Sequence, residues 1–325
     1  MARVRLSRWA VCAALCLLGI GLDAAAQRYP SKPIRLVVGF SPGGNVDITA
    51  RLVAQKLSQS LGEPVIVDNR GGAGGMIGAD LVAKSTPDGY TLLVVSSSHM
   101  INAATARHSP YDAVKDFSPV STLTHGPHFV AVNAAMPVNS IQELIALARA
   151  KPGSINFGSA GTGSLTHLEG EFFKSAAGID IVHVPYKSTN LAFTDLAGGH
   201  VQLVFSSTVS TLPFVRTGRV KALAVTSAKR LAAFPEIPTV AESGLPQFVV
   251  DSIAGMLAPA KTPRSIINKL SAEIRKFLST PEMHRALAAQ GAEAGGSTPK
   301  EYAERIAGEI ARWRKVAADA GIARK

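Results

Sequence analysis

Segments typical of β-strands alternate with segments typical of amphipathic helices along most of this chain, and this order constrains the fold more than any other feature. The β-branched apolar run 34–40 is typical of a strand buried on both faces. A loop at 41–45 breaks it. Apolar residues one or two turns apart over 46–61 then predict a helix, with Gly62 in the helix-terminating position. Shorter strand and helix patterns continue to residue 95, and such βαβ units form a parallel sheet wrapped by helices.

The alternation begins again in the middle of the chain. A capping box at 140–143 predicts the start of a helix, and the glycine-rich stretch 159–164 leads into another helix that ends near residue 177. Apolar runs predict further strands at 129–132, 181–184, 203–205 and 222–225, and residues 156–158 lead into the glycine-rich stretch.

The C-terminal part is expected to be mostly helical over 264–320. Thr262-Pro263 and Thr298-Pro299 each place a capping hydroxyl before a proline at the first helical position.

Two βαβ arrays predict an α/β protein of two lobes. No Ser/Gly linker separates the arrays, so the lobes are expected to be joined by strand-like crossings near residues 126 and 250. The predicted lobes are residues 27–125 with 251–325, and residues 126–250. A cleft between them would be faced by strand C-termini and helix N-termini, where α/β proteins usually bind ligands.

Residues 1–26 have the organisation of a secretory signal peptide. Three arginines precede an apolar run at 9–22, and Ala24 and Ala26 form a small-x-small cleavage site. The run is shorter than the ~20 residues that a bilayer-spanning helix needs. Cleavage after Ala26 is therefore expected, which predicts an exported, periplasmic protein.

Both cysteines of the chain, Cys12 and Cys16, lie in this leader. A retained anchor and a lipid anchor are the alternatives, but Leu15 stands where a lipoprotein has a small residue. Residues 27–325 contain no cysteine and so suit an oxidising compartment.

The formal net charge of +11 does not by itself indicate a nucleic-acid partner. Three arginines and one aspartate leave with the leader, and the remaining Lys and Arg residues are spread along the chain without interleaved aromatics. With 46% apolar and 18% charged residues, a mainly disordered chain is excluded. The positive charge suits small anionic ligands.

The tight strand-to-helix turn at 40–47 is the strongest local motif. Glycines let the backbone approach a ligand, and the free N–H groups of a helix N-terminus attract an anion. An ordinary βα turn, with Asp47 capping the helix, is the alternative. The candidate ligand-binding residues here are Phe40, Ser41, Pro42, Gly43, Gly44 and Asp47.

A second loop at 158–167 repeats this design in the other lobe. Its hydroxyls add donors to the backbone amides, and Ser164 is placed to cap the following helix. Two such loops from different lobes could close on one anion. The candidate residues here are Ser159, Gly161, Thr162, Gly163, Ser164 and His167.

Metal and enzyme signatures are weak. His125 and His128 are three residues apart, but Gly126-Pro127 breaks the helix that a metal pair at this spacing would need, so neither a metal nor a cofactor is predicted. The chain has no G-x-S-x-G elbow and no phosphate-binding P-loop. Ser164 with His167 is the least unfavourable catalytic pair, although no acid is evident to orient the imidazole.

The order and spacing of many short motifs resemble the exported solute-binding receptors of tripartite tricarboxylate transporters, often called Bug-type receptors. The resemblance spans nearly all of the chain after the leader. The motifs are FSPGG with Asp47 and Ala50-Arg51, Asn69-Arg70 with 72–75 and 77–78, PDGYTLL at 87–93, Tyr111-Asp112, Asp116-Phe117, SAGTGS at 159–164 with His167-Leu168, VPYK at 184–187, Asp195-Leu196 with Gly198-Gly199, Pro238-Thr239 with Glu242, and Ala258-Pro259-Ala260 with Thr262-Pro263.

The resemblance implies a hinged, two-lobed periplasmic binding protein-like fold (type II), each lobe a mainly parallel sheet flanked by helices. It implies no enzymatic activity and no metal. The protein would be a monomer that delivers a small carboxylate to the membrane components of a transporter. In such receptors the two glycine-rich loops contact the ligand carboxylate, partly through water. Tyr186 and Ser206 join the predicted site on the same basis.

Departures from the family pattern concern the ligand. Ser188 replaces a common glycine, Ser206-Ser207 stand where an acid often follows Phe205, and 251–253 lacks a common aromatic. Loss of a cleft acid favours a mono- or dicarboxylate without an amino group. The expected mechanism is closure of the lobes on the anion. A receptor that signals to a sensor partner instead of a transporter remains an alternative.

Overall fold

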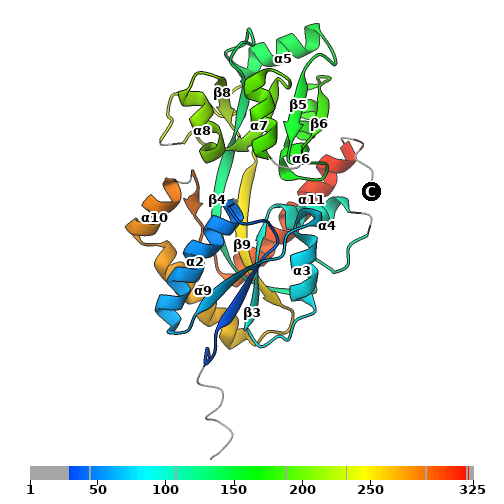
Figure 1. Ribbon diagram of the computed structural model, residues 1–325. Coiled ribbons are helices and arrows are strands. Elements are labelled where there is room, and N and C mark those ends of the chain that lie inside the picture. Colours follow the sequence, from blue (N-terminus) through cyan, green and yellow to red (C-terminus); the bar gives the residue numbers. More distant parts are fainter. Residues whose placement is uncertain are drawn as a thin grey trace, which may run out of the picture.

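The computed structural model describes residues 29–43, 45–106, 108–186, 189–231, 233–289, 291–319 and 321. Figure 1 shows two α/β lobes, one above the other, with two long strands running between them. The predicted leader 1–26 and Gly44 lie outside the described residues.

Lobe 1, the lower one in Figure 1, is built on three parallel strands, β1 (Ile34–Val38), β2 (Val65–Asn69) and β3 (Thr91–Ser96). Its connections carry α2 (Asn45–Leu61), the 3₁₀ turn η1 (Ala73–Gly75), α3 (Met76–Ala83) and α4 (Ser98–Thr105). Strand β1 is almost entirely buried, as its β-branched sequence predicts for a central parallel strand.

Lobe 2 repeats this plan with the parallel strands β5 (Asn156–Ser159), β6 (Val182–Pro185) and β7 (Leu203–Ser207). Strand β8 (Val220–Val225) pairs with β4. The helices of this lobe are α5 (Ile141–Ala150), α6 (Leu165–Ala177), α7 (Thr189–Gly198) and α8 (Thr208–Arg216).

The lobes are connected by two long strands, β4 (Phe117–Asn133) and β9 (Asp251–Pro259). Residues Phe117–Pro127 of β4 pair with β9, whereas His128–Asn133 pair with β7 and β8 in lobe 2. All of these ladders are antiparallel, as is β3 with β9. The two-lobed α/β fold is confirmed, but each parallel set is extended by antiparallel crossing strands, so the sheet is more mixed than expected.

The C-terminal segment contains α9 (Arg264–Leu278), α10 (Pro281–Ala288), the short β10 (Glu293–Ala294) and α11 (Pro299–Asp319). Thr298 and Glu301 form a reciprocal capping box at the start of α11. At α9 the structure differs from the prediction: the Thr262 hydroxyl donates to the Pro259 carbonyl and the helix begins at Arg264, with Pro263 at the N-cap position.

Helix α11 joins the two lobes and lies to the right of the crossing strands in Figure 1. Its Tyr302 and Ile306 pack in the lobe 1 core beside β3 and β9. One end of the same helix places Trp313 and Val316 in the lobe 2 core with Phe173 and Phe248. The C-terminal helix therefore contributes to both cores.

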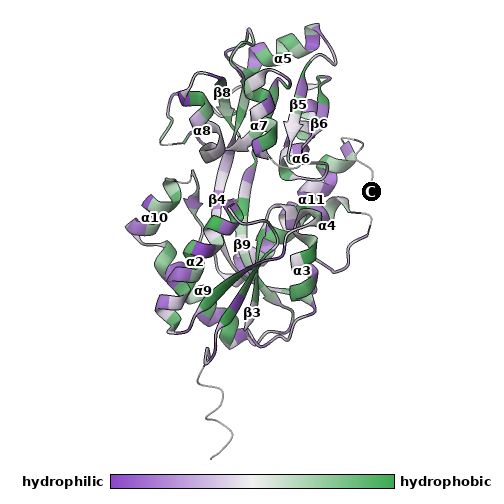
Figure 2. Cartoon of the chain, in the orientation of Figure 1, coloured by the Kyte–Doolittle hydropathy of each residue, from purple (hydrophilic) through white to green (hydrophobic). Residues whose placement is uncertain are grey.

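Hydropathy follows this architecture. In Figure 2 the strands of lobe 1 are mostly green, and the outer helices alternate green and purple along their length. An apolar stripe on a helix packs against the sheet while its polar face meets solvent. No helix among the described residues is long and apolar enough to cross a membrane.

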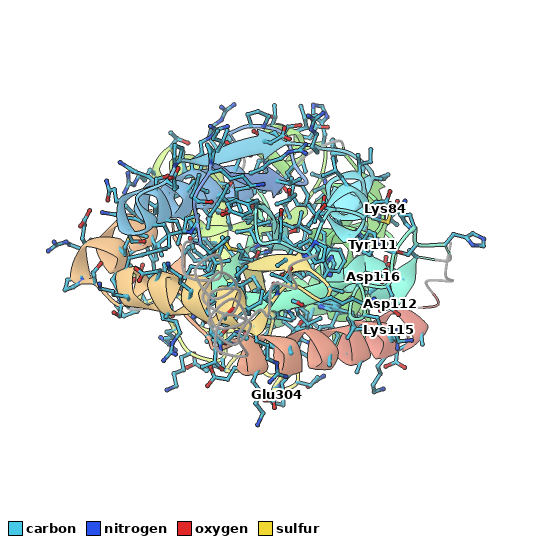
Figure 3. All side chains as sticks on the ribbon, turned by 90° about the horizontal axis from the view of Figure 1, so that it is seen from below. Lys84, Tyr111, Asp112, Lys115, Asp116 and Glu304 are labelled. Carbon is cyan, nitrogen blue, oxygen red and sulfur yellow. The ribbon has the colours of Figure 1, made fainter. Side chains whose placement is uncertain are left out.

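The connection between α4 and β4 packs next to α11. Figure 3 places the labelled Tyr111, Asp112, Lys115 and Asp116 close to the ribbon of α11, which carries Glu304.

The Tyr111 ring stacks on His99 with centroids 5.7 Å apart, and Phe117 meets both rings edge-on. Burial of His99 in this aromatic cluster lowers its pKa to about 4, which its hydrogen bond to the Ala113 carbonyl only partly opposes.

Candidate ligand-binding cleft

A cavity opens between the lobes beside the crossing strands. The empty space in it, open solvent included, is about 510 Å³. We call it the interlobe cavity. Its described lining consists of Asn45, Val46 and Thr49 of α2, Ser96, residues 124–128 of β4, Ser207, residues 252–254 of β9, Gly291 and Ala292.

The lining of the interlobe cavity is polar. It contains hydroxyls, one amide and two imidazoles, and none of its described residues is Asp, Glu, Lys or Arg. Two helices begin at it from opposite lobes: α2 at Asn45, and α8 directly after Ser207. Helix N-termini carry partial positive charge and unpaired N–H groups, so this wall can hold an anion without a basic side chain.

Among the described residues, two hydrogen bonds connect the lobes across the cavity. Asn45 Nδ2 donates to Ser207 Oγ at 3.1 Å. The Thr208 hydroxyl donates to the Gly291 carbonyl at 2.9 Å. Ser207 is the N-cap of α8 and Thr208 its first residue, so both contacts join this end of α8 to lobe 1.

The first predicted loop is organised by Asp47. Its carboxylate accepts from Gly43 N at 2.9 Å, from Arg51 Nε at 2.9 Å and from Asn69 Nδ2 at 2.9 Å. Ser41, Pro42 and Gly43 are exposed, and Gly43 has a φ of +84° that favours glycine. Asp47 therefore shapes the loop from beneath rather than presenting a free carboxylate to the cleft.

The Asp47 carboxyl is almost fully buried, with 2% of the residue exposed. Burial opposes its ionisation, but the hydrogen bonds from Arg51, Gly43 and Asn69 outweigh that penalty and lower its pKa below the usual 3.8. The charge is neutralised by Arg51 on the next turn of α2. Asn69 also donates to the Phe40 carbonyl, which links β2 to the start of the loop.

The second predicted loop is held by its own side chains. The buried Ser159 hydroxyl lies 2.6 Å from His183 Nε2 and accepts from Gly161 N at 3.0 Å. Gly163 N donates to His167 Nδ1 at 3.2 Å, and the Ser164 hydroxyl caps α6 by accepting from His167 N. The capping role predicted for Ser164 is confirmed.

These bonds determine which amides of the second loop remain for a ligand. Ala160 N donates to the Thr166 hydroxyl and Ser164 N to the Gly161 carbonyl, at 2.9 and 3.1 Å. From Ala160 to Ser164, Thr162 is the one residue whose amide has no partner among the described residues. Thr162 is also an exposed residue.

Tyr186 lies behind this loop. Its hydroxyl donates to Asp195 Oδ2 at 2.7 Å, and its amide donates to the Ser159 carbonyl at 3.1 Å. Burial and the Asp195 carboxylate raise the pKa of Tyr186 to about 12, so the phenol stays protonated. An added Cβ on Gly158 would come within 3.3 Å of the Tyr186 ring. A side chain at position 158 would therefore crowd this ring.

The predicted residues and the interlobe cavity do not coincide. Among the described residues, none of the predicted site residues lines this cavity, while Phe40 lines a small apolar pocket with Gly75 and His99. Ser206 is buried opposite Phe129 in the β4–β7 register, whereas its neighbour Ser207 lines the cavity. The ligand-binding role of the predicted residues therefore remains a prediction.

Cavity residues that the sequence analysis did not select include Asn45, Thr49, Thr124, Ser207 and Ser252. Asn45 is the first residue of α2 and Ser207 the last residue of β7, so both stand at the ends of motifs already noted. That position was the available signal. Among the described residues, no group of three or more His, Cys, Asp or Glu side chains is arranged to hold a metal ion.

Residues 49–322 match the model of the tripartite tricarboxylate transporter family receptor. The chain belongs to this receptor family. Protein BugT of Bordetella pertussis is 39% identical over 305 residues, a match that covers 93% of this chain and 94% of BugT. The family is one of solute-binding receptors rather than of enzymes, and this receptor's two-lobed architecture agrees with it.

Solved structures of similar proteins have the same fold. Rpa4515 of R. palustris, solved with adipate, superposes with a TM-score of 0.84 at 38% identity, covering 91% of this receptor and 99% of that chain. MatC of Rhodopseudomonas palustris, solved with bound malate, gives a TM-score of 0.79 at 31% identity, covering 89% and 99%.

Proposed function

We propose that this receptor captures a small carboxylate without an amino group in the cleft between its lobes, and delivers it to the membrane components of a tripartite tricarboxylate-type transporter. The observation that carries the proposal is the interlobe cavity, whose described wall contains no Asp, Glu, Lys or Arg and receives helix N-termini from both lobes. The similar receptors solved with adipate and with malate support a carboxylate ligand.

The two glycine-rich loops supply further contacts to the ligand carboxylate. The amide of Thr162, without a partner among the described residues, and the exposed Ser41–Gly43 turn support such contacts, directly or through water. Asp47, Ser159 and His167 act by shaping these loops, since their polar atoms already hold loop amides.

Binding is coupled to closure of the lobes about the crossing strands. We assign residues 27–125 and 251–325 to one lobe and 126–250 to the other. In support, β4 exchanges partners close to the first boundary, between Pro127 and His128, and β9 begins at Asp251. The ligand favours the closed arrangement because only there do both lobes contact it. The membrane partner recognises that closed surface.

The receptor works as an exported, periplasmic monomer without a cofactor or catalysis. The predicted leader at 1–26 supports export. The pair Ser164 and His167 is not arranged as nucleophile and base, because Ser164 Oγ accepts the backbone N–H of His167 while His167 Nδ1 accepts from Gly163.

The experiment is native mass spectrometry of the purified receptor, followed by a thermal-shift and calorimetric screen of carboxylates and amino acids. A ligand that binds only the folded state raises the melting temperature. We expect simple carboxylates to bind and amino acids to bind weakly. Tight binding of an amino acid with no binding of any simple carboxylate would overturn the proposal, as would turnover of ester or amide substrates.

A further inference from the structure

A buried acid and a histidine form a pair behind the wall of the interlobe cavity. His128 Nδ1 and Glu169 Oε2 are 2.7 Å apart. The Glu169 side chain is fully buried, and the His128 side chain keeps 9% of its surface exposed. His128 belongs to β4 and Glu169 to α6, so both lie in lobe 2 and the contact does not depend on closure of the lobes.

Glu169 is an unusual residue for the interior of α6. Its second oxygen, Oε1, is buried without a hydrogen-bond partner among the described residues. A buried carboxylate with one partner is costly, and buried unsatisfied groups in native proteins commonly mark a functional constraint. Among the described contacts, the charged or titratable group that meets the Glu169 side chain is the His128 imidazole. Glu169 is therefore suited to orienting that ring.

His128 is held so that one ring nitrogen remains for the cavity. Its backbone N–H donates to the Thr226 hydroxyl at 2.8 Å, and its Nδ1 faces Glu169. Nε2 has no hydrogen-bond partner among the described residues, and His128 lines the cavity. The other cavity histidine, His125, is directed to Glu293 instead, with Nδ1 and Oε2 3.9 Å apart.

The position of His128 places it at the closing contact between the lobes. His128 is directly opposite Ser207 in the antiparallel β4–β7 register, so their side chains share one face of the sheet. Ser207 accepts the amide hydrogen of Asn45 from lobe 1. A ligand group at Nε2 of His128 would thus be enclosed when the lobes are in contact.

We propose that His128, oriented by Glu169, determines specificity by binding the second carboxylate of a dicarboxylate ligand. This inference rests on the proposed function, and it adds the residue that binds the second carboxylate of the ligand. Glu169 contacts Nδ1, which leaves Nε2 as the ring nitrogen that donates a hydrogen bond to the ligand carboxylate. The described cavity wall offers no Lys or Arg for this role.

The test compares adipate with hexanoate, which has the same number of carbons but a single carboxylate, by isothermal titration calorimetry. Wild-type receptor is expected to bind adipate more tightly. The variant His128→Gln should lose about tenfold or more in adipate affinity, the effect of one hydrogen bond to a charged group, with hexanoate affinity unchanged. Glu169→Gln should reduce adipate affinity in the same direction. His108→Gln, at an exposed residue away from the cavity, is the matched control and should match wild type.

Each outcome has a distinct meaning. If wild-type receptor binds neither acid nor any other carboxylate, the proposed function fails. If wild type binds both acids and His128→Gln weakens both equally or neither, His128 does not read a second carboxylate and only this inference fails. If His128→Gln does not fold, ¹⁵N NMR of histidine-labelled wild type replaces it: adipate, but not hexanoate, should shift Nε2 of His128, and equal spectra would overturn the inference.

Discussion

Asn45 of lobe 1 donates through Nδ2 to the hydroxyl of Ser207 in lobe 2 at 3.1 Å, joining residues 162 positions apart in the chain. The bond links the start of α2 to the residue that caps α8, whose hydroxyl also accepts from Ser210 N. Because the contact is exposed, separation of the lobes breaks it at little desolvation cost. Under the proposed closure of the lobes, this contact forms only when they meet.

We expect Asn45→Ala to weaken ligand binding about three- to tenfold, because one net hydrogen bond of about 0.5–1.5 kcal/mol leaves the closed state. Calorimetric titration of the two single variants and the Asn45→Ala, Ser207→Ala double variant measures the coupling. Ser207→Ala should also cost about 1 kcal/mol of folding stability through the lost cap, whereas Asn45→Ala should not. Additive losses in affinity would show that the two residues do not act together.

Asp47→Asn is expected to destabilise the receptor by roughly 2 kcal/mol, because a buried carboxylate that holds Gly43, Arg51 and Asn69 is replaced by an amide that cannot accept all three hydrogen bonds. Urea unfolding measures the change. Asp319→Asn, which removes an exposed i,i+4 pair with Lys315, is the control and should stay within about 0.5 kcal/mol of wild type.

Asp47→Asn is also expected to change how the stability of the receptor depends on pH under acidic conditions. The folded-state pKa of Asp47 is below 3.8, so its stabilising contribution is complete above pH 3.8 and is lost as the pH falls through the folded pKa. Asp47→Asn should therefore flatten this part of the acid unfolding curve relative to wild type. An acid limb identical in both proteins would contradict the assignment of Asp47 as the ionised centre of the loop.

Gly255→Ala and Gly308→Ala should change stability in opposite directions. A Cβ at position 255 in β9 would overlap the ring of the fully buried Tyr302 of α11, so overpacking should cost about 1–3 kcal/mol. A Cβ at 308, on the exposed face of α11, meets nothing within 4 Å and should stabilise the helix by about 0.5–1 kcal/mol. Thermal and urea unfolding measure both, and a neutral Gly255→Ala would mean that α11 packs less tightly on β9.

Stability should fall on acidification because of His99, whose pKa drops from 6.5 to about 4 on folding. Between these values the unfolded chain binds the extra proton, so stability decreases as the pH is lowered from 6.5 towards 4, by roughly 3 kcal/mol in total. His99→Phe keeps the aromatic packing and removes the titration. Urea unfolding at pH 7, 5.5 and 4.5 should show a shallower decline for His99→Phe, and equal declines would exclude His99 as the cause.

Local features of the fold could be predicted because their causes lie within a few residues. The alternation of strand and helix patterns predicted the two α/β lobes, and Ser140 and Ser164 were identified as caps that the structure confirms. Such hydrogen bonds span three residues of one chain segment, so sequence spacing is enough to predict them. The motif order also predicted the receptor family, which the match over 49–322 confirms.

Contacts between distant segments could not be predicted in the same way. Strand periodicity indicated a short strand at 129–132, but nothing local shows that β4 runs from Phe117 to Asn133 and exchanges partners midway. Ser206, which the family resemblance selected, and Ser207, which lines the cavity, are consecutive residues of β7. A one-residue step moves a side chain to the other face of a sheet, and only the register of neighbouring strands determines it.

The sequence by itself therefore determined the elements, their caps, the two-lobed α/β plan and the receptor family, because these follow from spacing along the chain. Tertiary structure alone decided that Asp47 is enclosed by Asn69, that Glu169 meets His128 and that Asn45 reaches Ser207. Each of these pairs depends on how sheets and helices pack. The polar groups that line the cleft are therefore defined by the folded arrangement of segments that are far apart in the chain.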